Sequence, residues 1–133
     1  MPSQSNIDDL IRTVLEKHPA IDLAVLFGSL AKGTATSLSD LDLAVSATHP
    51  LDVNAKIKLI EDLAETTGRP IDLVDLRTAG EPLSGQILRN GRRILGSKTL
   101  FASFVTRHLI EQADFMPLRQ RILEERRRAW IGA

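Results

Sequence analysis

Residues 26–45 read LFGSLAKGTATSLSDLDLAV, and this stretch decides the fold. It begins at the end of an apolar run, continues through a small and polar segment from Ser29 to Ser39, and becomes apolar again from Leu41 to Val45. An apolar run that ends at a glycine is typical of a buried strand followed by a turn. The stretch therefore predicts a strand, an exposed turn and a second strand.

Helical periodicity appears on both sides of this stretch. Upstream, apolar residues recur every three or four positions after Ser5, and Asp8 stands where a capping box places its acidic partner. Downstream, a capping aspartate and a terminal glycine bracket a second periodic segment. The expected helices run from about Ile7 to His18, from Asp52 to Gly68, from Leu83 to Asn90, and from Lys98 onward with a break near Pro117.

Short apolar runs between these helices are the expected strands, because such runs are typical of strands buried on both faces. Strands and helices together predict an α/β (α+β) fold. We expect one domain over residues 1–133, with a core at about 7–95 and a helical extension at about 98–131. The expected strands are Ile21–Phe27, Leu41–Val45, Ile71–Leu76 and Arg93–Leu95.

Composition excludes several classes of protein. The 133 residues suffice for one small domain but leave little room for a second domain with its own substrate pocket. Seventeen basic and 17 acidic side chains balance, so no general attraction to nucleic acid is expected. The absence of cysteine excludes disulfides and zinc-thiolate sites. With no apolar run of about 20 residues and no signal-like start, we expect a cytoplasmic protein without membrane contact.

Two carboxylates are expected to share one edge of the second strand. Side chains alternate between the faces of a strand, so Asp40 and Asp42 lie on one side while Leu41 and Leu43 lie on the other. Neighbouring carboxylates repel each other, and a divalent cation with its preference for oxygen ligands relieves that repulsion. Asp72 in the third strand is a candidate third carboxylate. The pattern predicts a Mg²⁺ or Mn²⁺ site for phosphoryl or nucleotidyl transfer.

The Gly28-Ser29 pair is expected to contact a phosphate group. A glycine at a strand end lets the backbone approach a phosphate closely, and the amides that follow it can donate hydrogen bonds, as can the serine hydroxyl. Lys32 adds a positive charge, and Gly33 permits the chain to turn back towards the acidic strand. Ser39, at the end of the polar segment, completes the candidate nucleotide-binding residues.

Taken together, the Gly-Ser pair, the ten residues that follow it and the Asp-x-Asp pair resemble the signature of the DNA polymerase beta-like nucleotidyltransferase superfamily. The short length and the Gly-Ser-Leu-Ala-Lys-Gly form resemble the minimal nucleotidyltransferases, the antitoxin halves of HEPN/MNT toxin–antitoxin pairs. The resemblance covers about residues 7–95. It implies a small mixed sheet flanked by helices, a triphosphate-binding turn at Gly28 and Ser29, metal ligands at Asp40 and Asp42, and a third acid at Asp72.

This resemblance also implies a reaction. AMP from ATP would be transferred to a tyrosine of a partner HEPN ribonuclease, which is thereby silenced. Two alternatives stay open: an antitoxin that neutralises its partner by binding alone, and a nucleotidyltransferase for a small molecule. Lys32 stands where the family often has arginine, which keeps the charge but loses the forked geometry of a guanidinium.

The histidines are interpreted as structural or solvated. Arg12 and His18 have the spacing of an Arg-x5-His ribonuclease motif, but residues six apart do not share a helix face, so we expect them to be surface residues. His49 and His108 have no second histidine or acid at metal-ligand spacing. None of these residues is expected to be a site.

The C-terminal third carries most of the aromatic residues and a basic end. Its apolar side chains are expected to pack on the sheet or to contact a partner. The arginine-rich end is expected to be a solvated helix face, with an acidic partner or RNA held by that partner as the alternative. The residues concerned are Phe101, Phe104, Phe115, Met116, Trp130, Arg119, Arg121 and Arg126–Arg128.

Overall fold

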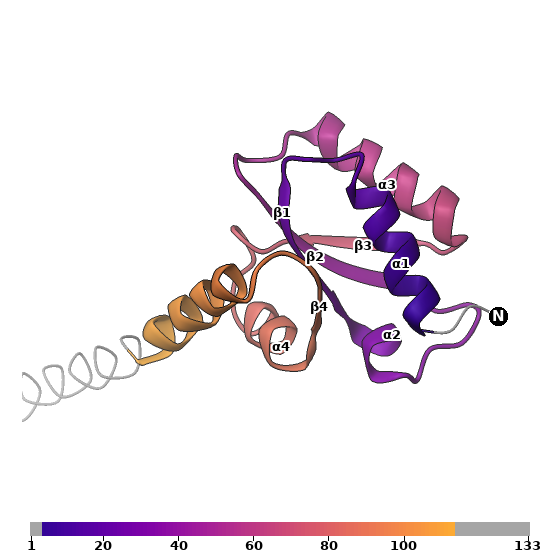
Figure 1. The fold of residues 1–133 in the computed structure, drawn as a ribbon. Coiled ribbons are helices and arrows are strands. Elements are labelled where there is room, and N and C mark those ends of the chain that lie inside the picture. Colours follow the sequence, from indigo (N-terminus) through magenta and orange to yellow (C-terminus); the bar gives the residue numbers. More distant parts are fainter. Residues whose placement is uncertain (1–3, 114–133) are drawn as a thin grey trace, which may run out of the picture.

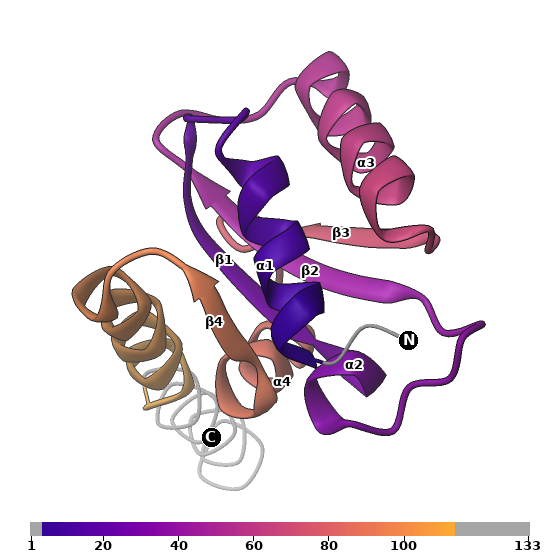
Figure 2. The ribbon, with the colours of Figure 1, turned by 45° about the vertical axis from the view of Figure 1, so that its right-hand side comes forward.

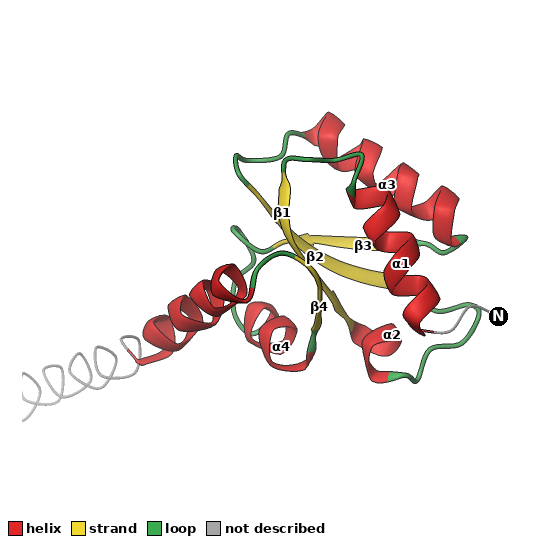
Figure 3. Cartoon of the chain, viewed as in Figure 1, coloured by secondary structure: helices red, strands yellow, loops and turns green. Residues whose placement is uncertain are grey.

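The computed structural model describes residues 4–113, which form a four-stranded sheet with helices on both faces (Figures 1 and 3). The expected α/β (α+β) class is confirmed. Residues 98–113 form a further helix, which we call the C-terminal helix. The elements are α1 (Gln4–Leu15), β1 (Ile21–Phe27), α2 (Gly28–Lys32), β2 (Leu41–Ala47), α3 (Val53–Thr67), β3 (Ile71–Asp75), α4 (Leu83–Asn90) and β4 (Arg92–Leu95).

The sheet is mixed, in the order β3-β2-β1-β4. Strand β1 pairs antiparallel with both β2 and β4, whereas β2 and β3 run parallel. A parallel pair needs a crossover of a dozen or more residues, and α3 supplies it between β2 and β3. The small mixed sheet expected from the resemblance is therefore present, with β2 at its centre beside β1.

One face of the sheet is covered by α1 and α3, which lie on the same side in Figures 1 and 2. Their apolar residues, such as Ile11 and Leu63, pack with alternate residues of β2 into one buried cluster. Leu41, Leu43 and Val45 all belong to this cluster and are fully buried. The alternation expected for β2 is thus confirmed, because its odd-numbered residues face α1 and α3.

The opposite face carries α4 and the C-terminal helix. Ala44 of β2 packs there with Ile87 of α4 and Phe104 of the C-terminal helix in a second buried cluster. Phe101 lies against the same cluster, so the aromatic residues at 101 and 104 pack on the sheet. Asp42, two residues before Ala44 on the same strand, therefore shares this face.

Some local expectations were wrong. Helix α1 begins at Gln4 and ends at Leu15, so Ser5 lies inside the helix rather than before it. Asp8 pairs with Arg92 of β4 at 2.9 Å instead of completing a capping box. The segment expected to be an exposed turn begins instead with the short helix α2, which follows β1 without a connecting loop.

Other expectations concern residues outside those that the structure describes. These are the break near Pro117, the extension to about residue 131, and the placement of the apolar and arginine-rich end, comprising Phe115, Met116, Arg119, Arg121, Arg126–Arg128 and Trp130. Within residues 4–113, no helix combines the length and the apolar character needed to cross a bilayer.

Arg12 is exposed, as expected for a surface residue, whereas His18 is partly buried, and both make contacts between elements. The Arg12 Nε atom donates a hydrogen bond to the Ile94 carbonyl of β4 at 2.9 Å. The His18 Nε2 atom lies 2.7 Å from the Asp62 Oδ2 atom of α3. This hydrogen bond is the largest cause of a lowered pKa at Asp62, with Lys58 adding a smaller effect. The turn between α1 and β1 is thereby attached to α3.

We expect Asp62→Asn to lower the melting temperature at pH 7, because it weakens the contact between His18 and α3. A carboxyl group whose pKa is lowered by folding stabilises the protein above its unfolded pKa, and this contribution is lost as the pH falls through the folded value. The difference from the parent chain should therefore shrink below about pH 4. Thermal unfolding between pH 7 and pH 3 measures it, with the exposed neighbour Glu61→Gln as control. Equal melting temperatures at pH 7 would contradict the prediction.

Candidate active site

Two carboxylates meet across the parallel pair of strands. Asp42 of β2 and Asp72 of β3 are direct partners in the register, so they lie on the same face of the sheet. Asp40 immediately precedes β2 and is exposed, as is Asp72, whereas Asp42 is half-buried. The structure thus brings the three predicted acidic residues to one edge of the sheet.

This grouping changes the acidity of Asp42. Its pKa is raised above the ordinary value, first by burial, then by the negative charge of Asp72, by a hydrogen bond with the Asp72 side chain, and by the charge of Asp40. A carboxylate pair of this kind favours holding a proton between its members. A cation placed there relieves the same repulsion.

Gly28 lies against Asp42, the half-buried carboxylate of this group. Its φ is +71°, and an added Cβ would stand 2.1 Å from the Asp42 Oδ2 atom. Any side chain at this position would therefore displace Asp42 and also strain the backbone. Gly28 and Ser29 are the first residues of α2, whose leading amides have no acceptors within the helix. The predicted phosphate-binding turn and the predicted carboxylates are in direct contact.

The other predicted nucleotide-binding residues lie along the path from α2 to β2. Lys32 is the exposed last residue of α2, and Gly33 ends the helix with a φ of 76°, as the expected turn requires. Ser39 accepts a hydrogen bond at its hydroxyl from the Thr36 amide at 2.8 Å. Its hydroxyl therefore organises the loop in front of Asp40.

Arg69 is a residue near the site that the sequence reasoning missed. Its Nη1 atom donates hydrogen bonds to the carbonyl oxygens of Thr36 at 2.8 Å and Ser39 at 2.9 Å. The residue lies just before β3, and its partners lie at least 30 residues earlier. The sequence offered only one indication of this role, namely a basic residue two positions before the strand that carries Asp72.

Asp75, the other acid of β3, serves a different purpose. Its Oδ1 atom accepts a hydrogen bond from the Arg77 amide at 2.9 Å, and its carbonyl accepts one from the Ala79 amide. These contacts shape the turn after β3 at the far end of the strand from Asp72. The geometry therefore agrees with the choice of Asp72 over Asp75 as the third acid.

In the part of the chain that the structure describes, no three or more histidine, cysteine, aspartate or glutamate side chains are arranged to hold a metal ion. The three predicted carboxylates are therefore not preformed as a metal site, although Asp72 and Asp40 both contribute, after burial, to the raised pKa of Asp42. Mg²⁺ in nucleotide sites is commonly held by one or two carboxylates together with waters and substrate phosphates. On that basis the oxygen donors present fit Mg²⁺ or Mn²⁺.

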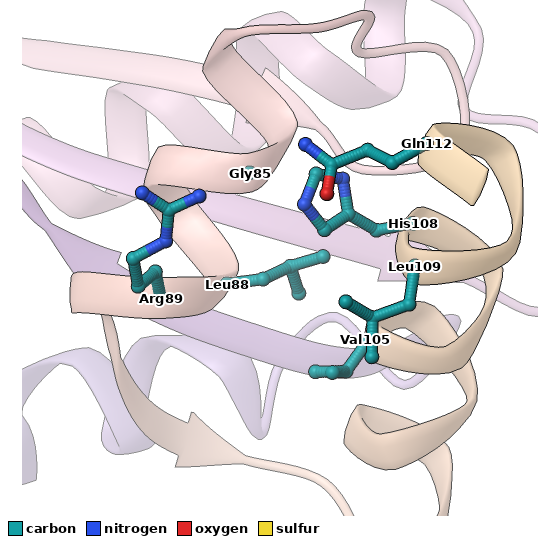
Figure 4. A pocket seen from close by; sticks show the side chains of 7 residues that line it. All are labelled: Gly85, Leu88, Arg89, Val105, His108, Leu109 and Gln112. Atoms are coloured by element: carbon teal, nitrogen blue, oxygen red, sulfur yellow. The ribbon is translucent and has the colours of Figure 1, made fainter. Parts of the chain in front are cut away.

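The remaining histidines lie outside this group. His49 is exposed, and its Nδ1 atom lies 3.4 Å from the Pro50 carbonyl oxygen. His108 is buried and pairs through Nδ1 with Glu81, so it has an acidic partner that its sequence neighbours did not reveal. It borders a depression of about 190 Å³ between α4 and the C-terminal helix (Figure 4). The lining residues are Gly85, Leu88, Arg89, Val105, His108, Leu109 and Gln112.

We expect Gly28→Ala to cost more stability than Gly68→Ala, which serves as its matched control. Both glycines have a φ near +70°, but an added Cβ at Gly68 meets nothing within 4 Å. Gly68→Ala should therefore cost about 1–2 kcal/mol of unfolding free energy from backbone strain alone. Gly28→Ala should cost more, because Asp42 must also move. Urea denaturation measures both.

Comparing Gly28→Ala with Gly68→Ala again in an Asp42→Ala background tests whether the contact between Gly28 and Asp42 causes the difference. With the Asp42 carboxylate removed, most of the extra cost of Gly28→Ala should disappear, since only the Cβ of residue 42, 3.3 Å away, remains in close contact. An extra cost that persists without the Asp42 carboxylate would mean that something else excludes a side chain at Gly28.

We expect Asp42→Asn to raise the melting temperature of the metal-free protein at pH 7. A carboxyl group whose pKa is raised by folding binds its proton more tightly in the folded state, so its ionisation destabilises the fold as the pH rises. The gain should shrink as the pH falls below the raised pKa. Thermal unfolding in a chelating buffer measures it, with the exposed Asp9→Asn as control. A lower melting temperature for Asp42→Asn at pH 7 would contradict the claim that the ionised Asp42 side chain destabilises the fold.

Comparisons with known proteins give this geometry a family. A family model described as polymerase beta, nucleotidyltransferase matches residues 9–114. The chain is 31% identical over 122 residues to the protein adenylyltransferase MntA of Shewanella oneidensis. The aligned region covers 92% of this chain and 88% of that protein. It is 36% identical over 73 residues to a probable protein adenylyltransferase MntA of Haemophilus influenzae, over 54% of this chain and 64% of that protein.

Solved structures agree with these relatives. A toxin–antitoxin structure with AMP-PNP matches with a TM-score of 0.76 and 31% identity, over 89% of this chain and 96% of that chain. A tri-AMPylated Shewanella oneidensis HEPN toxin in complex with its MNT antitoxin contains a chain that matches with a TM-score of 0.73 and 28% identity, over 92% of this chain and 98% of that chain. The chain therefore belongs to the polymerase beta nucleotidyltransferase family, in its branch of minimal nucleotidyltransferase antitoxins.

Proposed function

We propose that this protein is a metal-dependent adenylyltransferase that transfers AMP from ATP to a tyrosine of a partner HEPN ribonuclease and thereby neutralises it. The observation that carries the proposal is the contact between Gly28 and the Asp42 carboxylate, with Asp72 beside it in register. This contact joins a phosphate-binding turn to an acidic pair. The relatives that share this fold include named protein adenylyltransferases.

The nucleotide is expected to bind between α2 and the acidic edge of the sheet. Gly28 allows close approach of the triphosphate, while the first amides of α2 and the Ser29 hydroxyl donate hydrogen bonds to its oxygens. Lys32, exposed at the end of α2, is placed to add positive charge. Ser39 contributes by ordering the loop that leads to Asp40.

The transfer is a displacement at the α-phosphorus of ATP. The acceptor oxygen forms a bond to this phosphorus while the bond from the phosphorus to the bridging oxygen of the β-phosphate breaks, and pyrophosphate leaves with the electron pair. Asp72 takes the proton of the acceptor hydroxyl, a role open to an exposed carboxylate next to the reacting group.

Asp40, Asp42 and Asp72 are the residues that would hold Mg²⁺ or Mn²⁺. Such a cation, once bound, neutralises charge on the phosphates and lowers the cost of placing them against carboxylates. The raised pKa of Asp42 arises first from burial and then from the negative charges of Asp72 and Asp40, and a bound cation would counteract both effects. The protein itself orients the phosphates and receives the proton.

The openness of the site supports a protein as acceptor. Asp40 and Asp72 are both exposed, so an acceptor side chain on a large partner can reach them. A partner protein brings its own surface and needs no pocket on this chain. We propose that the chain acts as one nucleotidyltransferase domain in the cytoplasm, in complex with its toxin and without direct contact to nucleic acid.

We expect Asp40→Asn and Asp42→Asn each to lower transfer of labelled AMP to the toxin by about 100-fold or more, since loss of metal-assisted charge neutralisation removes several kcal/mol of barrier lowering. The assay mixes the purified chain, ATP labelled at the α-phosphate, Mg²⁺ and the partner HEPN protein. Asp9→Asn, exposed on α1, is the matched control and should keep full activity.

Three results would contradict the proposal. Labelling that survives Asp42→Asn or chelation of the metal would remove the carboxylates from catalysis. Protection of cells by the Asp40→Asn, Asp42→Asn double variant, at the level of the parent chain, would favour neutralisation by binding alone. A labelled small molecule in place of labelled toxin would favour the small-molecule nucleotidyltransferase.

A further inference from the structure

The chain between α2 and β2 carries Asp40 without the support of a helix or strand. It forms an irregular loop on the outside of the molecule (Figure 3). Leu38 near its end is 88% exposed, and Ala35, earlier in the loop, packs against the core only in part. Burial therefore holds the start of the loop but not the residues next to Asp40, whose backbone position depends on hydrogen bonds.

Two sets of hydrogen bonds act on this loop. Within it, the Thr36 amide donates to the Ser39 hydroxyl at 2.8 Å, and the Ser39 amide donates to the Thr36 carbonyl at 3.2 Å. From outside, the Arg69 guanidinium donates to the carbonyl oxygens of the same two residues at 2.8 and 2.9 Å. The internal bonds give the turn its shape, and Arg69 attaches that turn to the start of β3.

The attachment continues the pairing of β2 with β3. The Leu41 amide donates to the Pro70 carbonyl at 2.8 Å, so the residue after Asp40 is tied to the residue after Arg69. Ser39, the residue before Asp40, is tied to Arg69 itself. The backbone on both sides of Asp40 is therefore fixed relative to the strand that carries Asp72.

We propose that Arg69 is a positioning residue, which clamps the loop and keeps the backbone of Asp40 close to Asp42 and Asp72, so that the Asp40 carboxylate can join a cation bound there. This inference rests on the proposed function in that it takes Asp40 as a metal ligand. Arg69 acts through the Thr36 and Ser39 carbonyls and does not touch the reacting groups.

The charge and the clamp of Arg69 predict opposite effects on a cation. A guanidinium near a cation site repels the cation, so its removal should tighten binding if charge alone matters. Loss of the clamp frees Asp40 and should weaken binding instead. The direction of the change in affinity for Mn²⁺ therefore separates the two roles.

The experiment compares the parent chain with Arg69→Met, Arg69→Lys and the control Arg77→Met. Arg77 follows β3 at its other end, and its contact with Asp22 is a loose one at 4.0 Å. Binding of Mn²⁺ to the full chain is measured by calorimetry, and hydrogen exchange is followed in residues 33–41. We expect Arg69→Met to weaken Mn²⁺ binding by about tenfold, as loss of supporting hydrogen bonds around metal ligands generally does.

Exchange in the loop should be faster in Arg69→Met, and Arg69→Lys should restore part of both properties because an ammonium can still donate to these carbonyls. Arg77→Met should leave both unchanged. Unaltered loop exchange in Arg69→Met, or unaltered or tighter Mn²⁺ binding, overturns the inference. A parent chain without transfer activity overturns the proposed function instead, and the loop exchange still decides whether Arg69 is the clamp.

Discussion

The parallel pairing of β2 with β3 is the constraint on which the site depends. It places Asp42 directly opposite Asp72, about 4.8 Å away in strand spacing, although 30 residues separate them in the chain. The crossover through α3 makes the pairing possible, and the packing of α3 against α1 holds it in place. A shift of one residue in this register would turn the Asp72 side chain to the other face and dissolve the pair.

The cluster of Asp40, Asp42 and Asp72 lowers the free energy of unfolding, and other interactions in the fold must offset this loss. Burial and two neighbouring carboxylates raise the pKa of Asp42, and the close contact with Gly28 leaves that carboxylate little room to move away. The apolar clusters on both faces of the sheet offset this cost, since each contains several fully buried side chains. Asp42 is thus held where its ionised form is unfavourable, as expected for a carboxylate whose charge is to be neutralised by a bound cation.

Much of this arrangement could be predicted from local pattern. The alternation of side chains along a strand predicted which face each of residues 41–45 takes. Gly28 was expected to let the backbone approach a phosphate, and its close contact with the Asp42 side chain was not predicted. Apart from the grouping of Asp72 with Asp42, contacts between distant segments could not be predicted. The clamp of Arg69 on Thr36, the pairing of Asp8 with Arg92 and that of His108 with Glu81 join residues whose spacing in the chain has no regular period. Such contacts follow from tertiary packing, which a single sequence does not display.

Uneven coverage of the sheet explains why the site is open. On the face of Asp42, Ala44 is fully buried under the cluster that includes α4 and the C-terminal helix, while Asp42 is half-buried and Asp72 is exposed. The cover that α4 and the C-terminal helix give to this face of β2 therefore ends between Ala44 and Asp42. The helices of this face complete the core at one end of the strands and leave the carboxylates uncovered at the other. An acceptor as large as a protein can approach that uncovered edge, and under the proposed function this partner would supply the remaining wall of the site.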